Sequence, residues 1–388
     1  MTPSSPTPWT ALIVLMTAGL AFSTGAFVFG GLLTPMAADL GVSVAAVAQL
    51  QAVFALACAV GGPSLAIALR RVDRKRLLVA VMLVLAAVNA ASATMSSYGG
   101  LVALRIGGGF VGALTLPLAS ALAVSLVAEA QRGRALATVS AGTAFSLLIG
   151  IPLGSVIGDA YGWRAAFWMA AVLPVLVAGL ISALVPGPEA GGPPPEAKGV
   201  FGAPLPLLYA CTLLAFVATF ASVGLIERLI ITLTGARGAG LGAMQALVGI
   251  GSLLGLAAGA RLAERVGTRS LLPLFAVIAI CQAIYAGALY AGVSGSVGIA
   301  AFALGTIPGA AALFATFPVI YAGIAARAGA AATLAFAING ATIFLGQGLG
   351  VALGSVTFAA LGLWPVGVVG AAVGLIGLGI ARRLRASA

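Results

Sequence analysis

Long apolar runs recur along the whole chain, and the charged residues gather in the short stretches between them. Of the 388 residues, 62% are hydrophobic and 7% are charged, whereas a soluble domain carries roughly 25% charged residues. Each run reaches about 20 residues, which is enough to cross a hydrocarbon layer of about 30 Å as a helix. One such run is compatible with a helix buried in a soluble protein, but twelve of them are not. The sequence therefore predicts an all-α membrane protein.

The runs form two groups of six, separated by a polar segment rich in proline and glycine. The first six predicted spans are 9–36, 44–69, 77–97, 100–128, 134–158 and 162–185. The second six are 204–233, 239–263, 269–292, 295–323, 330–358 and 362–381. A segment of this composition between two sets of helices is typical of a linker. The predicted domains are an N-terminal six-helix bundle at 1–186, a linker at 187–203 and a C-terminal six-helix bundle at 204–388.

A cluster of basic residues follows the second predicted span, and a weaker copy of it follows the eighth. The first cluster contains Arg70, Arg71, Asp73, Arg74, Lys75 and Arg76. The second begins 194 positions later and contains Glu264, Arg265, Gly267 and Arg269. Both clusters run into a pair of leucines. This repeat at corresponding places in the two groups of spans indicates an internal duplication.

The positions of the basic residues predict the orientation of the chain. With the N-terminus inside the cell, fifteen of the nineteen lysines and arginines lie near cytoplasmic ends of spans, and such an excess marks cytoplasmic loops. We therefore expect both termini and the linker in the cytoplasm. The first span has no basic residue before it and no small-residue cleavage site after it, so we expect it to be retained as a helix. Because the net charge of +11 is spread over these short loops, it argues for membrane orientation and against nucleic-acid binding.

Four segments carry a family pattern, and they follow one another through the first half of the chain. They are Leu32–Pro35 with Ala38–Ser43, Gly62–Leu78, Arg105 with Gly109, and Gly150–Gly154 followed by Gly162–Phe167. In this order and spacing they resemble the major facilitator superfamily, and within it the bacterial drug and sugar-efflux exporters of the proton-antiporter type. The resemblance implies two pseudo-symmetric six-helix bundles in a bacterial inner membrane, working by alternating access.

The two basic loops depart from the family pattern Gly-x-x-x-Asp-Arg-x-Gly-Arg-Arg. In the first copy the acid position holds Arg70 and the second glycine is Asp73, while the second copy keeps the acid as Glu264 together with Gly267. Many relatives also carry an acid midway along the first helix, where this chain has Ala26. The resemblance implies a conformational motif that includes Arg70, Asp73, Arg74, Arg76, Glu264, Arg265, Gly267 and Arg269. Its first copy lacks the acid that contacts a neighbouring helix end in relatives.

Glu227 is the one acid predicted to lie inside a span, the seventh, while the other seven acids fall at span ends or in loops. A charge at the centre of a membrane helix costs roughly 2.5–3.5 kcal/mol on insertion scales, so it usually faces a partner or an aqueous cavity. One interpretation is that Glu227 pairs with Arg228 or reaches the outer interface, although neighbouring residues on a helix do not face each other. The other is that Glu227 faces a central cavity and carries a coupling proton or contacts a cationic substrate.

Arg105 lies near the start of the fourth span, four residues before Gly109. In relatives the matching arginine is buried and linked to proton coupling, so the resemblance implies the same role here. The alternative is an arginine whose long side chain reaches out to the interface. Pro152, between Gly150 and Gly154, is expected to bend the fifth span because proline removes one intrahelical hydrogen bond. That segment resembles the antiport element of the exporters, although proline is also tolerated in membrane helices without such a role.

The resemblance places a substrate cavity between the halves, lined by spans one, four, seven and ten, near the middle of the membrane. Candidate contacts are Phe27, Phe220, Arg228, Asn339 and Gln347. Asn339 and Gln347 are eight residues apart and share one face of the eleventh span. Phenylalanines in membrane helices more often serve packing, so two interpretations remain for Phe27 and Phe220: packing residues or substrate contacts. Apolar walls with few polar groups suit a lipophilic or weakly polar solute.

The sequence contains no histidine, no metal-ligand set, no nucleophile triad and no nucleotide-binding glycine loop. We therefore expect no enzyme activity, no metal and no cofactor. The favoured function is secondary active export of a small drug or metabolite by proton antiport, in a chain that works as a monomer with protons, a small-molecule substrate and the lipid bilayer as its partners. A proton-independent uniporter, a symporter, and a non-transporting sensor built on a transporter fold remain the alternatives.

Overall fold

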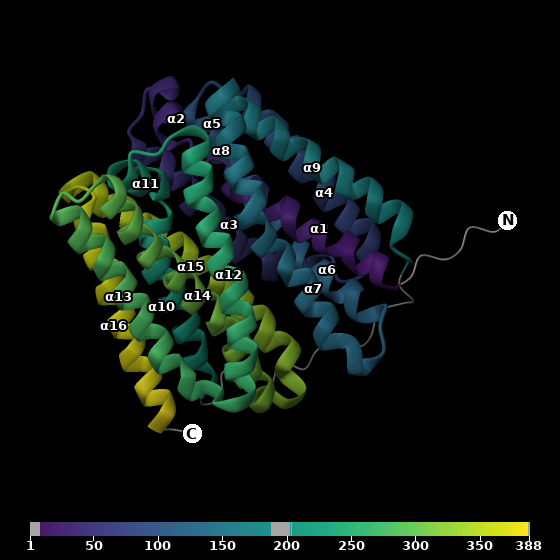
Figure 1. Cartoon of the computed structure of the whole chain (residues 1–388). Helices are drawn as coiled ribbons and strands as arrows, with labels where there is room; N and C mark the ends of the chain where they lie inside the picture. Colours follow the sequence, from purple (N-terminus) through teal and green to yellow (C-terminus); the bar gives the residue numbers. More distant parts are fainter. Residues whose placement is uncertain (1–7, 188–201, 203, 387–388) are drawn as a thin grey trace.

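The computed structural model describes residues 8–187, 202 and 204–386, and within them every regular element is a helix. We call α1 to α9 the N half and α10 to α16 the C half (Figure 1). The N half contains α1 (Pro8–Phe27), α2 (Leu33–Leu40), α3 (Val44–Ala68), α4 (Arg74–Thr94), α5 (Tyr98–Gly112), α6 (Thr115–Ser125), the 3-10 turn η1 (Glu129–Gln131), α7 (Arg132–Phe145), the π turn η2 (Ser146–Gly150), α8 (Ile151–Tyr161) and α9 (Trp163–Leu184). The C half contains α10 (Leu205–Val223), α11 (Ile226–Thr234), α12 (Gly238–Arg265), the 3-10 turn η3 (Gly267–Ser270), α13 (Leu271–Tyr290), α14 (Gly295–Ala328), the 3-10 turn η4 (Gly329–Ala331), α15 (Ala332–Leu361) and α16 (Trp364–Ala386).

Twelve segments of the described chain are helical, long and apolar enough to cross a membrane. This confirms the predicted all-α membrane fold with twelve spans. The segment predicted as the linker, 187–203, lies almost wholly outside the described residues.

Spans one and seven each contain a break, so the predicted ranges 9–36 and 204–233 extend past the candidate membrane helices Trp9–Phe27 and Leu205–Val223. Span four is a single candidate membrane segment, Tyr98–Ser125, with a turn between α5 and α6. Span one breaks between α1 and α2, where the amides of Gly30 and Leu32 form tight turns instead of continuing the helix. Gly31 lies within this break and close to α12 of the C half, since an added Cβ would lie 2.8 Å from the side chain of Leu241. Span seven breaks between α10 and α11 next to Gly224. Gly30 and Gly224 are related by the same 194-residue offset that relates the two basic loops, so the duplication extends to the helix breaks.

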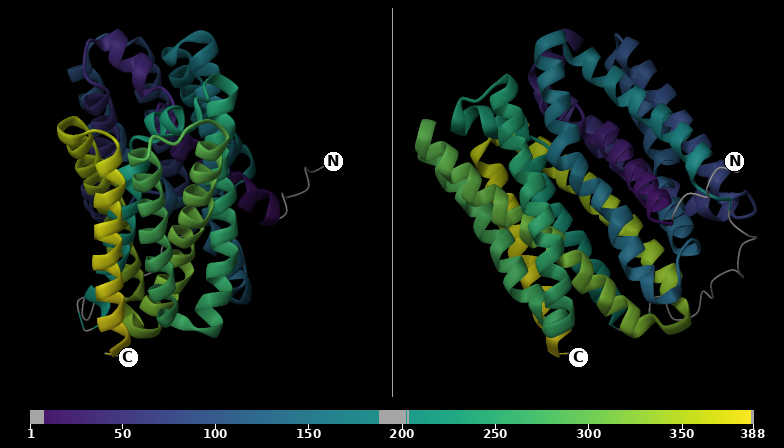
Figure 2. Two further views of the ribbon diagram at one scale, coloured as in Figure 1. Left: turned by 60° about the vertical axis from the view of Figure 1, so that its left-hand side comes forward. Right: turned by 45° about the vertical axis from the view of Figure 1, so that its right-hand side comes forward.

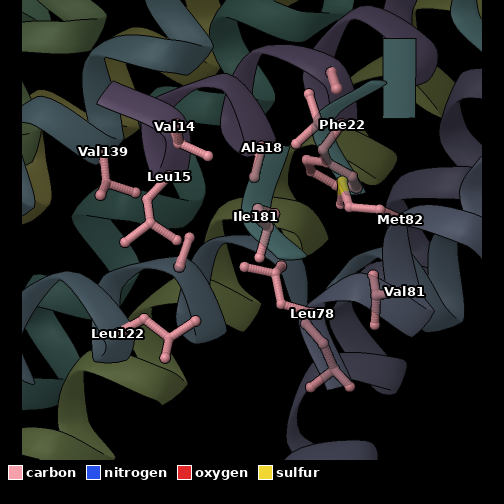
Figure 3. Packing of buried hydrophobic residues seen from close by; sticks show 14 of the residues in the cluster. Val14, Leu15, Ala18, Phe22, Leu78, Val81, Met82, Leu122, Val139 and Ile181 are labelled. Carbon is pink, nitrogen blue, oxygen red and sulfur yellow. The ribbon is translucent and has the colours of Figure 1, made fainter. Parts of the chain in front are cut away.

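Each half is held together by its own apolar core. In the N half, α1 packs against neighbouring helices of the same half that include α4, α6, α7 and α9 (Figure 3). Leu15 from α1, Leu78 from α4, Leu122 from α6 and Ile181 from α9 are all fully buried in this cluster. Small residues elsewhere on these helices let the backbones approach closely, which is how helices associate in lipid.

The two halves contact each other mainly at one end of the molecule. We call this end, which contains α2 and α11, the distal end, because it lies away from both termini (Figure 1). Toward the N and C termini the spans of the two halves diverge, as the right-hand view of Figure 2 shows. The final residues of α3, Ala66–Ala68, are accordingly exposed, although the first half of α3 packs along α15.

At least three hydrogen bonds between described residues join the halves at the distal end. The Gln49 amide donates to the Ala352 carbonyl at 3.4 Å, and the Ser155 hydroxyl donates to Gln245 Oε1 at 2.6 Å. The third joins Thr34 to Glu227. The distal end is therefore closed in this conformation.

Candidate functional site

Glu227 lies in the first turn of α11 and is buried, with 3% of its surface exposed. Its Oε2 atom accepts a hydrogen bond of 2.8 Å from the backbone amide of Thr34 in α2. The carboxylate therefore contacts the N half, and among the described residues it forms no salt bridge with Arg228. The sequence predicted Glu227 inside the seventh span, but the candidate membrane helix ends at Val223, and Glu227 lies beyond it in α11. The sequence also could not identify the partner of Glu227, which lies 193 positions away.

Arg228 follows Glu227 but is only half-buried. Its Nε atom is buried and has no hydrogen-bond partner among the described residues. Arg228 stays a predicted substrate contact, since a buried donor without a partner is free to bind a solute acceptor.

Arg105 is buried in α5, with 2% of its surface exposed. This excludes the alternative that its side chain reaches the interface. The Nη1 atom donates to the Gly25 carbonyl at 2.9 Å, while Nε and Nη2 have no partner among the described residues. No salt bridge joins Arg105 to any acid in the described part of the chain.

Three aromatic rings surround the Arg105 guanidinium. Its central carbon lies 4.7 Å from the ring centre of Phe29, 4.8 Å from that of Phe167 and 5.7 Å from that of Phe54. Desolvated contacts of this kind stabilise a cation by about 2 kcal/mol or more. A small cavity beside Arg105 is lined partly by Ala26, the position where relatives carry an acid. The rings of Phe29, Phe54 and Phe167 and the Gly25 carbonyl thus surround the Arg105 guanidinium in place of an acidic side chain.

A row of phenylalanines joins the halves next to these charged residues. The ring centres of Phe27 and Phe220 lie 6.0 Å apart, and those of Phe22 and Phe344 lie 6.2 Å apart in an edge-to-face arrangement. Phe216 stacks on Phe220 with ring centres 5.7 Å apart. The structure brings Phe27 and Phe220 together between the halves, and their role as substrate contacts stays a prediction. Phe344 was missed because its span shows no signal that distinguishes this position from other apolar ones.

Asn339 and Gln347 differ in their surroundings although they share one face of α15. Asn339 is fully buried, and its Oδ1 atom accepts a 2.7 Å hydrogen bond from the Thr212 hydroxyl in α10. That bond fixes Asn339 inside the C half in this conformation. Gln347 is half-buried. Both stay predictions as substrate contacts, and Gln347 is the better placed of the two.

The two basic loops lie at the ends of their helices, away from the distal end. Asp73, which replaces a family glycine, caps α4 by accepting a hydrogen bond of 2.8 Å from the Arg76 amide. Gly267 adopts a φ of 64°, a left-handed conformation that favours glycine. The remaining predicted motif residues, Arg70, Arg74, Glu264, Arg265 and Arg269, are exposed or half-buried. In the described part of the chain, no salt bridge links either loop to a partner.

The predicted bend in span five appears as the π turn η2, which ends at Gly150. Pro152 lies in the first turn of α8 and cannot donate a backbone hydrogen bond. A wider turn before a proline accommodates the missing bond. On its C-half side this segment meets α12, because a Cβ at Gly242 would lie 3.1 Å from the Pro152 carbonyl. Gly154 packs instead against Val28 within the N half.

Comparison with known proteins agrees with this architecture. The family model of the Major Facilitator Superfamily matches residues 15–335. The chloramphenicol resistance protein of Streptomyces lividans is 34% identical over 261 residues, which cover 66% of this chain and 67% of that protein. The MFS-type transporter YtbD of Bacillus subtilis is 28% identical over 284 residues, covering 72% of each chain.

Solved structures share the fold along nearly the whole chain. A bacterial homolog of the human lysosomal transporter Spinster, in an inward-facing and occupied conformation, has a TM-score of 0.77 at 18% identity and covers 98% of this chain and 97% of that chain. The D-xylose–proton symporter has a TM-score of 0.74 at 18% identity, with coverages of 96% and 97%. With two six-span halves, a closed distal end and a family match over most of its length, the chain belongs to the major facilitator superfamily and is a multi-pass membrane transporter.

Proposed function

We propose that the chain exports a small lipophilic or weakly polar solute across a bacterial inner membrane, in exchange for protons. The observation that carries this proposal is the pair of phenylalanine contacts that join the halves, Phe27 with Phe220 and Phe22 with Phe344. An apolar surface with a few polar groups suits a neutral solute with limited hydrogen-bonding capacity. The similarity to a chloramphenicol resistance protein supports export and makes chloramphenicol the first solute to test.

The orientation that the basic residues predict completes the proposal. With both termini in the cytoplasm, the distal end that is closed in the described conformation faces the outside. Solute would then enter between the diverging halves and leave when the distal end opens, as alternating access requires.

Glu227 and Arg105 are the proposed coupling groups. Both are ionisable and buried, Arg105 within a candidate membrane span and Glu227 just beyond one. Ionisable groups along a transport pathway commonly form proton relays. Glu227 can bind and release a proton directly, whereas Arg105 would act through its positive charge.

Transport of chloramphenicol into proteoliposomes tests the proposal. Purified protein is reconstituted, and uptake of radiolabelled chloramphenicol is measured with the interior acidic, with the interior at equal pH, and after an ionophore has collapsed the gradient. We expect uptake against a concentration gradient only when the interior is acidic, and loss of that accumulation in Glu227→Gln. The exposed acid Glu129 provides the matched control, Glu129→Gln, which should transport normally. Accumulation that is insensitive to the pH gradient would reject proton antiport, and absence of chloramphenicol flux would reject that substrate.

A further inference from the structure

The carboxylate of Glu227 lies at the beginning of α2, a helix that belongs to the other half. The N-cap residue of α2, Leu32, offers no side-chain hydrogen bond to the first turn. The first amides of a helix have no partner within the helix and carry partial positive charge. The Thr34 amide in this turn donates to Glu227 at 2.8 Å. Glu227 thus does for α2 what an N-cap side chain normally does from the adjacent position in the sequence.

We propose that Glu227 caps α2 across the two halves and that its negative charge holds the distal end closed. The inference rests on the alternating-access part of the proposed function, but it depends neither on the identity of the solute nor on its direction of transport. When the distal end opens, Glu227 and the first turn of α2 must separate, and the capping interaction is lost. The cap therefore stabilises the closed distal end relative to the open one.

The internal repeat explains why this contact forms between the halves. Helices α2 and α11 both follow a helix break, and the 194-residue offset relates Gly30 to Gly224 in these breaks. The same offset relates Leu33, the first residue of α2, to Glu227. Equivalent elements of two pseudo-symmetric halves meet near the axis that relates them. The duplication thus brings the two short helices together, and the acid is present in only one copy.

Protonation of Glu227 would remove the charge on which the cap depends. The other charged or titratable side chains at this end, on α11 and on the elements packed against it, are Arg228 on α11, Asp39 on α2, Arg237 before α12, and Tyr285 and Tyr290 on α13. Helices α10 and α14 have no charged residue in their distal portions.

Apart from Arg228, these neighbours have other partners or are exposed. Asp39 forms a salt bridge of 2.6 Å with Arg164, and the Tyr285 hydroxyl is hydrogen-bonded to Thr306 at 2.7 Å. Arg237 and Tyr290 are exposed. Arg228 is half-buried next to Glu227 and acts on the carboxylate through its charge, which favours the charged form of Glu227. Protonation of Glu227 and opening of the distal end are therefore linked.

The distance between two spin labels at the distal end measures the proposed effect. Exposed serines offer one position in each half, Ser96 between α4 and α5 and Ser296 at the start of α14. Both are replaced by cysteine and labelled after the buried native cysteines have been changed to alanine; these are Cys58, Cys211 and Cys281. Double electron–electron resonance on the full chain in nanodiscs then gives the populations with short and long distances.

Glu227→Gln keeps the size of the side chain and removes the charge. We expect the ratio of open to closed distal ends to rise by about 2- to 30-fold, the range that corresponds to a charge at a helix N-terminus. We also expect the population with the long distance to grow in the wild type as the pH is lowered from 8.5 to 4.5, and this pH response to be absent in Glu227→Gln. The exposed acid Glu129, which lies in neither basic loop, gives the control Glu129→Gln, which should match the wild type.

A second variant removes the donor and leaves every acid in place. Thr34→Pro deletes the amide that donates to Glu227 at 2.8 Å, in the first turn of α2, where backbone amides have no partner within the helix. It should shift the distances in the same direction as Glu227→Gln. The double variant should shift them no further, because both changes remove one interaction.

Three outcomes would overturn the proposal: unchanged distances in Glu227→Gln, additive shifts in the double variant, or an equal pH response in the wild type and Glu227→Gln. Since the readout is a distance, it stays informative if chloramphenicol is not transported. Failure of the proposed function appears separately, as absence of flux.

Discussion

Gly249 in α12 makes one of the tightest contacts between the halves. An added Cβ would lie 2.6 Å from Leu148 Cβ in the π turn η2 and would also meet the Leu148 backbone. The N half would have to move away to accommodate it. Gly249→Ala should therefore destabilise the closed distal end and leave the open form, in which this contact is broken, unaffected.

The size of the effect follows from the cost of overpacking. An extra carbon in a well-packed interface costs about 1–3 kcal/mol, and each 1.4 kcal/mol changes an equilibrium tenfold. The ratio of closed to open distal ends should thus fall by about 5- to 150-fold in Gly249→Ala. The gain in helix propensity from glycine to alanine is common to both conformations and cancels.

Gly255, in the same helix, supplies a matched control. An added Cβ there would lie 2.7 Å from Ala311 Cα in α14, which belongs to the same half. Gly255→Ala should therefore lower the melting temperature without changing the ratio of the two conformations. The spin-label pair at Ser96 and Ser296 measures that ratio, and thermal unfolding monitored by tryptophan fluorescence measures stability. Unchanged distances in a folded Gly249→Ala protein, or equal distance changes in both variants, would refute the reasoning.

Two further predictions concern charged side chains. Arg105→Met removes a buried cation that has no acidic partner in the described residues, so the melting temperature should stay the same or rise. Proton-driven transport should fall by at least about tenfold, the size of a typical coupling free energy. A large loss of stability with normal transport would contradict this. Hydrogen bonding from Arg164 lowers the pKa of Asp39 below its ordinary value of 3.8, so the pair stabilises the fold at neutral pH and this stabilisation is lost as the pH falls through the lowered pKa of the folded state. Asp39→Asn should reduce the free energy of unfolding at pH 7 by roughly 0.2–1 kcal/mol, because the pair is partly exposed. The difference in unfolding free energy between this variant and the wild type should shrink below about pH 4. A difference that is constant with pH would rule the ion pair out as its cause.

The apolar runs and the repeated loop predicted the spans and the duplication well, because both depend on local composition. A run of about 20 apolar residues has few alternatives to a membrane helix. The breaks after Phe27 and Val223 were missed because glycines such as Gly30 and Gly224 are frequent in unbroken membrane helices as well. What distinguishes these glycines is packing against the rest of the fold, and that is not visible in the local sequence.

The surroundings of Arg105 and Glu227 could not be predicted for a related reason. The rings around Arg105 come from three separate segments, through Phe29, Phe54 and Phe167. The partner of Glu227 is a backbone amide, and backbone groups carry no signal in the sequence. Intramembrane charges could thus be identified as unusual, but their partners required the structure.

The two ends of the molecule differ in what can hold them closed, and the difference favours the described conformation. The relative stability of two conformations is set by the interactions that each makes and the other lacks. The closed distal end gains the Glu227 contact, the pair between Ser155 and Gln245, and close packing at Gly249. At the opposite end, the first basic loop has Arg70 where the family pattern has an acid. Closing that end would therefore gain less than in relatives with the complete pattern. A chain with a strong distal contact and a weakened opposite one should rest with its distal end closed, so that solute binding or protonation of Glu227 must provide the free energy to open it.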